Sequence, residues 1–414
     1  MKINVFGSEI SSLVCAGCLA ETGNFVTLIG TPDLARTEPG LVKLLKAQVA
    51  AERLTYSDTL DADAKVHIIA SNPDECSKGK EYARLLANYV TPKSCLIIRS
   101  NFSLGTPRQI GELAKMPWLV NPDFASEGQA ISGFLRPDRL VIGSENEYAI
   151  DLFKRLFAPF NRNRDVTILM SPESAELTKY ATNAMLATRI SLMNDLAQAA
   201  EYLNADIEEV RQGLGADSRI GFSYLYPGIG FGGTHFERDL SRAQTLIQSA
   251  GSHSSLLQSV LDINKEQKEV LFRKLWQHFD CDLEGKTVAL WGISYKPNSN
   301  SIENAPSLVL IKAFLAQGCT LKVFDPKLDD NFSQWMQTEL TAEQRARIHI
   351  SPDMYAATEQ ADALCVVTEW KQFWLPDMNL LSANMRTKII LDGRNLYQKP
   401  WVKSYGFDYY GIGR

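Results

Sequence analysis

Short apolar runs alternate with longer stretches of helical periodicity from residue 1 to about residue 165. The runs at residues 1–7, 26–29, 66–71, 94–98 and 140–142 have the character of buried strands. Residues 13–20 have the apolar character of a buried helix directly after the first strand. Alternating strands and helices are typical of a mostly parallel sheet flanked by helices. The pattern therefore predicts an α/β region at the start of the chain.

The pattern changes after residue 173. Ser171-Pro172-Glu173 is an N-terminal helix signal, and residues 174–204 read as one long helix. Shorter helical segments follow at residues 205–214 and 238–278, before a second set of strands. Those strands are expected at residues 286–292, 321–325, 363–367 and 389–391. We predict two Rossmann-like parallel-sheet domains (1–173 and 281–414) joined by a helical region (174–280).

Composition narrows the class of protein. The 414 residues are 45% hydrophobic and 22% charged, with a net charge of -5, which favours neither nucleic acid nor a membrane as partner. No apolar run reaches the roughly 20 residues of a membrane span, and no signal peptide is visible. The seven cysteines are scattered, so we expect a reduced cytoplasm. The histidines have no metal-ligand spacing, and no metal is expected.

The turn after the first strand is a degenerate dinucleotide-binding motif. In G-x-G-x-x-G the second glycine admits the pyrophosphate and the third allows close helix packing. This chain keeps Gly7 but has Glu9 and Ser12 at the other two positions. A carboxylate at residue 9 could cap the helix and take the place of the anion. Gly30 stands where an acid would bind the ribose. These changes predict that NAD does not bind and that no cofactor is used.

Several longer motifs carry a family resemblance. They are NPDFASEG at 121–128, AELTKYATN at 175–183, DSRIGFSYLYPGIGFGGTHFERD at 217–239, WGISYKPNSNSIENAPS at 291–307 and LDGRNLY at 391–397. In this order they resemble the UDP-glucose/GDP-mannose dehydrogenase family over nearly the whole chain, and the C-terminal motifs are almost those of the bacterial UDP-glucose form. That family oxidises a sugar CH2OH to a carboxylate through a thioester on a cysteine. Here His235 replaces that cysteine.

The resemblance implies catalytic and ligand-binding positions in this chain. Lys179 and Asn183 are four residues apart on one helix face and match the groups at the reacting carbon. Asp239 matches the aspartate beside the nucleophile, and Glu127 matches a glutamate that supports proton movement. Arg219 matches an arginine that crosses a dimer interface, and residues 174–280 match the helical region through which the family dimerises. The remaining UDP-sugar-binding matches are Tyr224, Leu225, Gly232, Gly233, Lys296 and Arg394.

The departures from the family collect on the oxidation side. Asn101 replaces a threonine near the reacting centre, Glu303-Asn304 replaces an Arg-Glu pair, and Arg238 replaces a lysine. The substrate side is kept, whereas the nucleophile and two glycines of the cofactor turn are lost.

Three functions remain open at this stage. The first is a pseudoenzyme that binds a UDP-sugar, as a homodimer or with an active relative, and regulates or scaffolds polysaccharide precursor supply. The second is an active NAD-dependent UDP-glucose 6-dehydrogenase that uses an atypical route. The third is a non-redox nucleotide-sugar enzyme that uses His235, Asp239 and Lys179. The first accounts best for losses that lie in two separate regions and serve one reaction.

Overall fold

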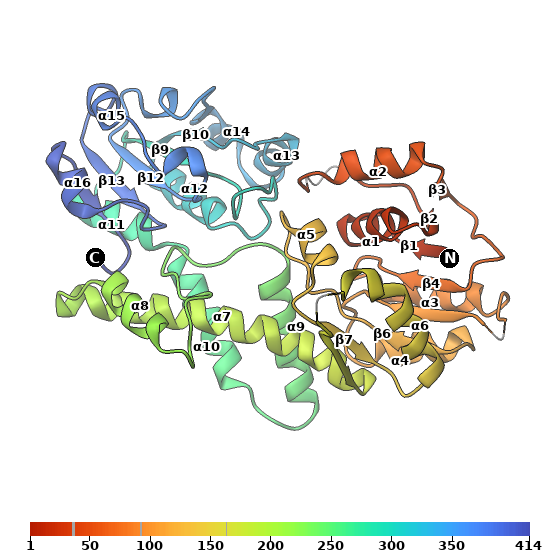
Figure 1. Cartoon of the computed structure of the whole chain (residues 1–414). Helices are drawn as coiled ribbons and strands as arrows, with labels where there is room; N and C mark the ends of the chain where they lie inside the picture. Colours follow the sequence, from red (N-terminus) through yellow and green to blue (C-terminus); the bar gives the residue numbers. More distant parts are fainter. Residues whose placement is uncertain (35–37, 92, 163) are drawn as a thin grey trace. The chain divides into compact units, whose positions relative to one another are not determined.

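The computed structural model describes residues 1–34, 38–91, 93–162 and 164–414. These residues form two compact units, Met1–Thr182 and Asn183–Arg414. Each unit contains a sheet with helices around it (Figure 1). The sheet of the first unit is mostly parallel, and that of the second unit is parallel throughout. The predicted α/β class with two Rossmann-like domains is therefore confirmed. None of the helices in the described ranges is long and apolar enough to span a bilayer.

The first unit contains an eight-stranded sheet of order β3-β2-β1-β4-β5-β6-β7-β8. All neighbouring strands are parallel except β6 and β7, which pair antiparallel. The strands are β1 Lys2–Phe6, β2 Phe25–Ile29, β3 Leu54–Ser57, β4 Val66–Ile69, β5 Cys95–Ile98, β6 Trp118–Val120, β7 Leu140–Gly143 and β8 Thr167–Met170. Every residue of β4, β5 and β7 is buried, as expected for strands covered on both faces.

Helices cover the two faces of this sheet. They are α1 Ile10–Glu21, α2 Leu41–Ala50, α3 Cys76–Leu86, α4 Thr106–Ala114, α5 Ala130–Leu135 and α6 Glu147–Phe157. Residues 3 and 5 of β1 pack with α1, α2 and α5 in one core cluster. Residue 6 packs with α3 and α4 in another. Because successive strand residues point to opposite faces, the two clusters lie on opposite sides of the sheet.

The second unit begins within the long helix α7, Pro172–Leu203. Three helices occupy the region predicted only as helical between residues 238 and 278: α9 His235–Ser249, α10 Ser255–Gln267 and α11 Val270–His278. Helix α8, Ile207–Ala216, precedes them. The boundary that matters for the site is the start of α9, because His235 is its first residue.

The rest of the second unit is a six-stranded parallel sheet of order β11-β10-β9-β12-β13-β14. Its strands are β9 Thr287–Trp291, β10 Thr320–Phe324, β11 Ile348–Ile350, β12 Ala363–Val366, β13 Ile389–Asp392 and β14 Asp408–Tyr410. Its helices are α12 Pro306–Ala316, α13 Asp330–Glu339, α14 Ala342–Ala346, α15 Met378–Asn384 and α16 Lys399–Ser404. The turns after β9 and β13 border the loop that carries Gly232 and Gly233.

Candidate functional site

The turn after β1 keeps the backbone of a dinucleotide-binding turn. Gly7 has φ +140°, and a Cβ there would lie 2.7 Å from the carbonyl oxygen of Ala70, so only glycine fits. Ser12, at the third glycine position, is buried, and its Oγ donates to the carbonyl oxygen of Glu9 at 2.7 Å. The hydroxyl therefore packs under the turn, and loss of the third glycine leaves the turn intact.

Glu9 does not occupy the anion position as the sequence suggested. It is the N-cap residue of α1, but its side chain makes no capping hydrogen bond. Its Oε1 instead accepts an N–H from Asn72 Nδ2 at 2.8 Å. Glu9 is thus directed to the loop after β4, and it does not satisfy the free N–H groups of α1.

The end of β2 explains why residue 30 is a glycine. Gly30 has φ +128°, and a Cβ there would lie 3.2 Å from the carbonyl oxygen of Gly7. The chain then returns to the turn, because Asp33 N–H donates to the carbonyl oxygen of Ser8 at 2.8 Å. The backbone of the turn is thus closely packed against the end of β2, and residue 30 supplies no acid for a ribose.

Asn101 lies in a closely bonded group beside this turn. Its side-chain amide exchanges two hydrogen bonds with the backbone of Asp123, at 3.1 and 3.2 Å. The Asp123 carboxylate pairs with Arg99 at 3.2 Å and accepts the Ser11 hydroxyl. Burial opposes ionisation of Asp123, but Arg99, the Ser11 hydroxyl, the N–H of Ala125 and the charge of Lys179 together hold its pKa below the usual value.

Lys179 and Glu127, both predicted as catalytic, lie in the first unit. Lys179 is buried, with its Nζ 5.3 Å from the centre of the Phe124 ring. Glu127 is half-buried, and the segment after it is held by Glu38, which accepts the N–H groups of residues 128 and 130 at 2.6 and 2.8 Å. The ammonium of Lys179 thus lies against the 121–128 segment.

Glu176 is a buried acid that the sequence reasoning did not single out. Its Oε2 accepts the N–H of Gly105, the N-cap residue of α4, at 2.8 Å. Its Oε1 is buried and has no hydrogen-bond partner among the described residues. Burial raises the pKa of this carboxyl to about 7, although the Gly105 N–H acts to lower it. Its position three residues before Lys179, on the same helix face, was the available signal.

Four side chains of the second unit contact one another around the start of α9, and we refer to them as the α9 network. Asn183 Nδ2 donates to Asp239 Oδ2 at 2.6 Å, and Arg238 Nε contacts Asp239 Oδ1 at 3.1 Å. The other end of the Arg238 guanidinium lies 3.2 Å from His235 Nδ1. Asp239 is completely buried, whereas His235 is exposed. The histidine thus lies at the start of the helix, and none of the four side chains is a cysteine.

Three amide side chains that the sequence reasoning missed hold the loop before α9. Asn194 Oδ1 accepts the N–H of Gly228 at 2.8 Å, and Gln267 Nε2 donates to the Gly228 carbonyl at 2.7 Å. Asn264 accepts the N–H of Phe231 at 2.7 Å and donates to its carbonyl at 3.1 Å. We refer to Asn194, Asn264 and Gln267 as the amide clamp. These bonds fix the backbone of the loop, and we refer to residues 228–233 as the clamped loop.

Gly232 and Gly233 pack against the segment after β9. A Cβ on Gly232 would lie 2.7 Å from the carbonyl oxygen of Asn304, and one on Gly233 would lie 2.8 Å from the Tyr295 ring. Gly233 N–H donates to the carbonyl of Glu303 at 2.7 Å. Close packing alone therefore requires glycine at both positions, whether or not a ligand also contacts them.

The remaining predicted residues have different environments. Leu225 is buried, while Tyr224 has φ +60° and lies near Phe236, with ring centres 6.2 Å apart. Lys296 Nζ lies 5.2 Å from the centre of the Tyr295 ring. Arg219 is exposed and pairs with Asp217 at 2.6 Å.

Arg394 borders the clamped loop. Its Nε donates to the carbonyl of Val367 at 2.7 Å and lies 3.1 Å from Glu369 Oε2. Its Nη1 would be 3.6 Å from a Cβ on Gly228. These contacts hold the guanidinium beside the loop, so Arg394 has a structural role in addition to any role in ligand binding.

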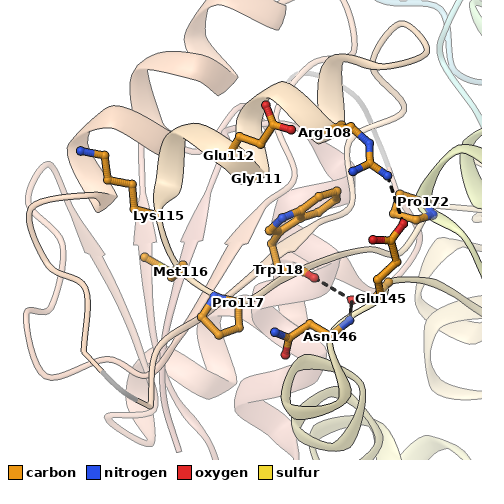
Figure 2. A pocket seen from close by; sticks show the side chains of 11 residues that line it. Arg108, Gly111, Glu112, Lys115, Met116, Pro117, Trp118, Glu145, Asn146 and Pro172 are labelled. Carbon is orange, nitrogen blue, oxygen red and sulfur yellow. Dashed lines mark hydrogen bonds and ion pairs between the residues drawn. The ribbon is translucent and has the colours of Figure 1, made fainter.

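Two open clefts lie away from these residues. One, of about 500 Å³ in the first unit, has the Trp118 indole beside Arg108, which pairs with Glu145 (Figure 2). The other, of about 590 Å³ in the second unit, is lined by Asp325, Asp329 and neighbouring residues. Neither cleft contains a residue that the sequence predicted for the site. The α9 network and the clamped loop therefore remain the candidate functional site.

Comparison with known proteins identifies the family of this chain. Residues 1–161, 173–266 and 289–399 match, in turn, the NAD binding domain, the central domain and the UDP binding domain of the UDP-glucose/GDP-mannose dehydrogenase family. The chain belongs to that family.

Individual relatives match from end to end. The chain is 37% identical to a UDP-glucose 6-dehydrogenase of Pseudomonas aeruginosa, covering 100% of this chain and 98% of the relative. It is 33% identical to a UDP-glucose 6-dehydrogenase of Rickettsia bellii, covering 100% and 99%. The fold is similar to a UDP-glucose dehydrogenase structure from Pyrobaculum islandicum, with TM-score 0.85, 24% identity and coverage of 100% and 97%.

The prediction that the protein uses no cofactor was wrong. Residues 1–161 match the NAD binding domain of the family, and the full-length relatives are dehydrogenases, which points to NAD. The physical reason for the error lies in the turn. Glu9 is held by Asn72 instead of capping α1, and Ser12 packs without displacing the backbone. Counting glycines did not reveal either arrangement.

Proposed function

We propose that this protein binds a UDP-sugar at the clamped loop and does not carry out the complete oxidation of a sugar CH2OH to a carboxylate. The observation that carries the proposal is His235 at the first position of α9, bonded to Arg238, where the family resemblance implies a cysteine. A thiolate adds to an aldehyde and is a good leaving group from an acyl carbon, whereas an imidazole cannot form a thioester. The match to the UDP binding domain supports the UDP-sugar ligand.

An active NAD-dependent UDP-glucose 6-dehydrogenase is the second candidate. The match of residues 1–161 to the NAD binding domain favours it. NAD, when bound, would accept hydride from the sugar, and water would have to add to the aldehyde without a covalent intermediate. Acid–base catalysis without redox chemistry is less well supported, because both Asp239 oxygens already accept contacts from Asn183 and Arg238.

An assay of product formation separates these functions. The full chain is incubated with UDP-glucose and NAD, absorbance at 340 nm is followed, and the sugar nucleotides are identified by mass spectrometry. We expect no UDP-glucuronate. The P. aeruginosa relative serves as the positive control. Formation of UDP-glucuronate with two equivalents of NADH would establish the second candidate and overturn the first.

The biological role that we propose is regulation or scaffolding of polysaccharide precursor supply in the cytoplasm. The seven cysteines are all free, which is compatible with a reducing compartment. A chain that keeps a UDP-sugar site and lacks the nucleophile could pair with an active relative. A pull-down of the active relative from the native host would support this role.

We also propose that the protein is a dimer that associates through α7. Met185 and Leu192 are seven residues apart on this helix and are 63% and 50% exposed, so one face of α7 presents two large apolar side chains. Arg219 is exposed and could reach a neighbouring subunit. Light scattering is expected to give the mass of a dimer at micromolar concentration. A monomer would contradict this proposal and would remove Arg219 from the ligand site.

A further inference from the structure

The carboxyl ends of β1 and β4 mark the place where a dinucleotide crosses a sheet of this topology. The two strands are parallel neighbours in the order β3-β2-β1-β4-β5. In such sheets the strand order reverses between them, and the dinucleotide lies across their carboxyl ends. Here the two ends approach closely, because a Cβ on Gly7 would lie 2.7 Å from the carbonyl oxygen of Ala70. The match of residues 1–161 to the NAD binding domain assigns this place to NAD.

One hydrogen bond joins the loops that follow these two strands. Glu9 lies in the turn after β1, directly before α1, and Asn72 lies in the loop after β4. Glu9 Oε1 accepts an N–H from Asn72 Nδ2 at 2.8 Å, and both side chains are half-buried. A carboxylate acceptor makes this bond stronger than one between neutral groups. We refer to it as the strap.

The loop after β4 fixes the Asn72 end of the strap. Asn72 Oδ1 accepts the N–H of Asp74 at 2.9 Å, and the Asn72 carbonyl accepts the N–H of Glu75 at 3.0 Å. A side-chain amide has an acceptor oxygen and a donor nitrogen. Because the oxygen is bonded within its own loop, the nitrogen is the end that reaches Glu9. The strap is therefore built into the fold of this loop.

We propose that the strap must open when the first unit binds NAD, and that Glu9 and Asn72 thereby lower the affinity for this cofactor. Residue 9 is the second glycine position of the dinucleotide motif, where the backbone has to approach the pyrophosphate. The Glu9 side chain stands in that approach and is held there by Asn72. Opening the strap breaks a charge-assisted hydrogen bond. The inference concerns the first unit alone and holds whether or not a UDP-sugar binds to the second.

Calorimetric titration of the full chain with NAD tests the strap from both of its ends. We expect Asn72→Ala and Glu9→Ala each to bind NAD about tenfold more tightly than the wild type, because binding no longer breaks a hydrogen bond to a charged group. Glu21→Ala is the matched control, since Glu21 is exposed at the other end of α1, and it should leave the affinity unchanged. Urea unfolding shows beforehand that each variant is folded.

Glu9→Gln separates the strap from simple charge repulsion. Glutamine keeps an acceptor oxygen for Asn72 but removes the charge, so this variant should gain less affinity than Glu9→Ala. Charge repulsion alone would make the two Glu9 variants equal and leave Asn72→Ala at the affinity of the wild type, and that result would overturn the strap. Failure of every variant to bind NAD up to about 1 mM would also overturn it.

The opening can be observed directly in ¹⁵N-labelled full chain. The side-chain NH2 signal of Asn72 is identified by its loss in Asn72→Ala, and it should shift in Glu9→Ala because its acceptor is gone. Saturation of the wild type with NAD should also shift this signal away from its position in the free protein. An Asn72 signal that NAD leaves unchanged would show that the strap stays closed, and would contradict the inference.

Discussion

Substitution of Asn264 by alanine is expected to lower the free energy of unfolding by about 2–6 kcal/mol and to abolish UDP-sugar binding. Asn264 is buried on α10 and bonds both the N–H and the carbonyl of Phe231, at 2.7 and 3.1 Å. Its removal leaves two buried backbone groups without partners, at roughly 1–3 kcal/mol each. The loop would then lose the conformation that places Gly232 and Gly233 against the 295–304 segment.

Urea unfolding and calorimetric titration measure the two effects. Gln258→Ala is a matched control on the same helix, because its amide makes exposed contacts with Gln244 and Asp262. Surface changes of this kind alter stability by less than about 0.5 kcal/mol. If Asn264→Ala retains wild-type stability and UDP affinity, the amide clamp does not hold the loop.

Substitution of Glu176 by glutamine is expected to stabilise the protein more at pH 8 than at pH 5. Burial raises the pKa of Glu176 from 4.5 to about 7. Between those two values the folded state binds more protons than the unfolded state, so stability falls as pH rises through this window. A shift of this size corresponds to about 3 kcal/mol, which is a penalty on the ionised form above pH 7. Glutamine remains neutral and avoids the penalty.

Urea unfolding of wild type and Glu176→Gln at pH 5 and pH 8 provides the test. Glu173→Gln is the control on the same helix. Its hydrogen bond with Arg108 lowers the pKa of Glu173, so that this carboxyl is mostly ionised in both the folded and the unfolded state across this range. Its effect should be the same at both pH values. A Glu176→Gln effect that is also independent of pH would show that this carboxyl titrates normally.

The fold could be predicted because its strands are distinct in sequence. Residues 66–69 and 95–98 are apolar or buried throughout, as expected for central parallel strands. The start of the long helix was predicted within a few residues from Ser171-Pro172-Glu173, and α7 begins at Pro172. The region 238–278 was predicted only as helical, because the breaks between its three helices have weak local signals.

The site was only partly predictable, because much of it depends on contacts between distant residues. Asp239 and Asn183 belong to motifs and were predicted from the sequence, and the structure brings them into hydrogen-bond contact. The amide clamp could not, since Asn194 and Asn264 bond a loop more than thirty residues away. The orientation of Glu9 toward Asn72, at a separation of 63 residues, is a second example. That contact decided whether residue 9 blocks the turn.

Calorimetric titration of the full chain with UDP-glucose tests the UDP-sugar site most directly. NAD is then added, and the sugar nucleotide is recovered and identified. We expect saturable binding that UDP competes and that Asn264→Ala abolishes, with no UDP-glucuronate recovered. Absence of binding up to about 1 mM, which corresponds to a free energy near -4 kcal/mol, would contradict the UDP-sugar site. Recovery of UDP-glucuronate would contradict the loss of complete oxidation.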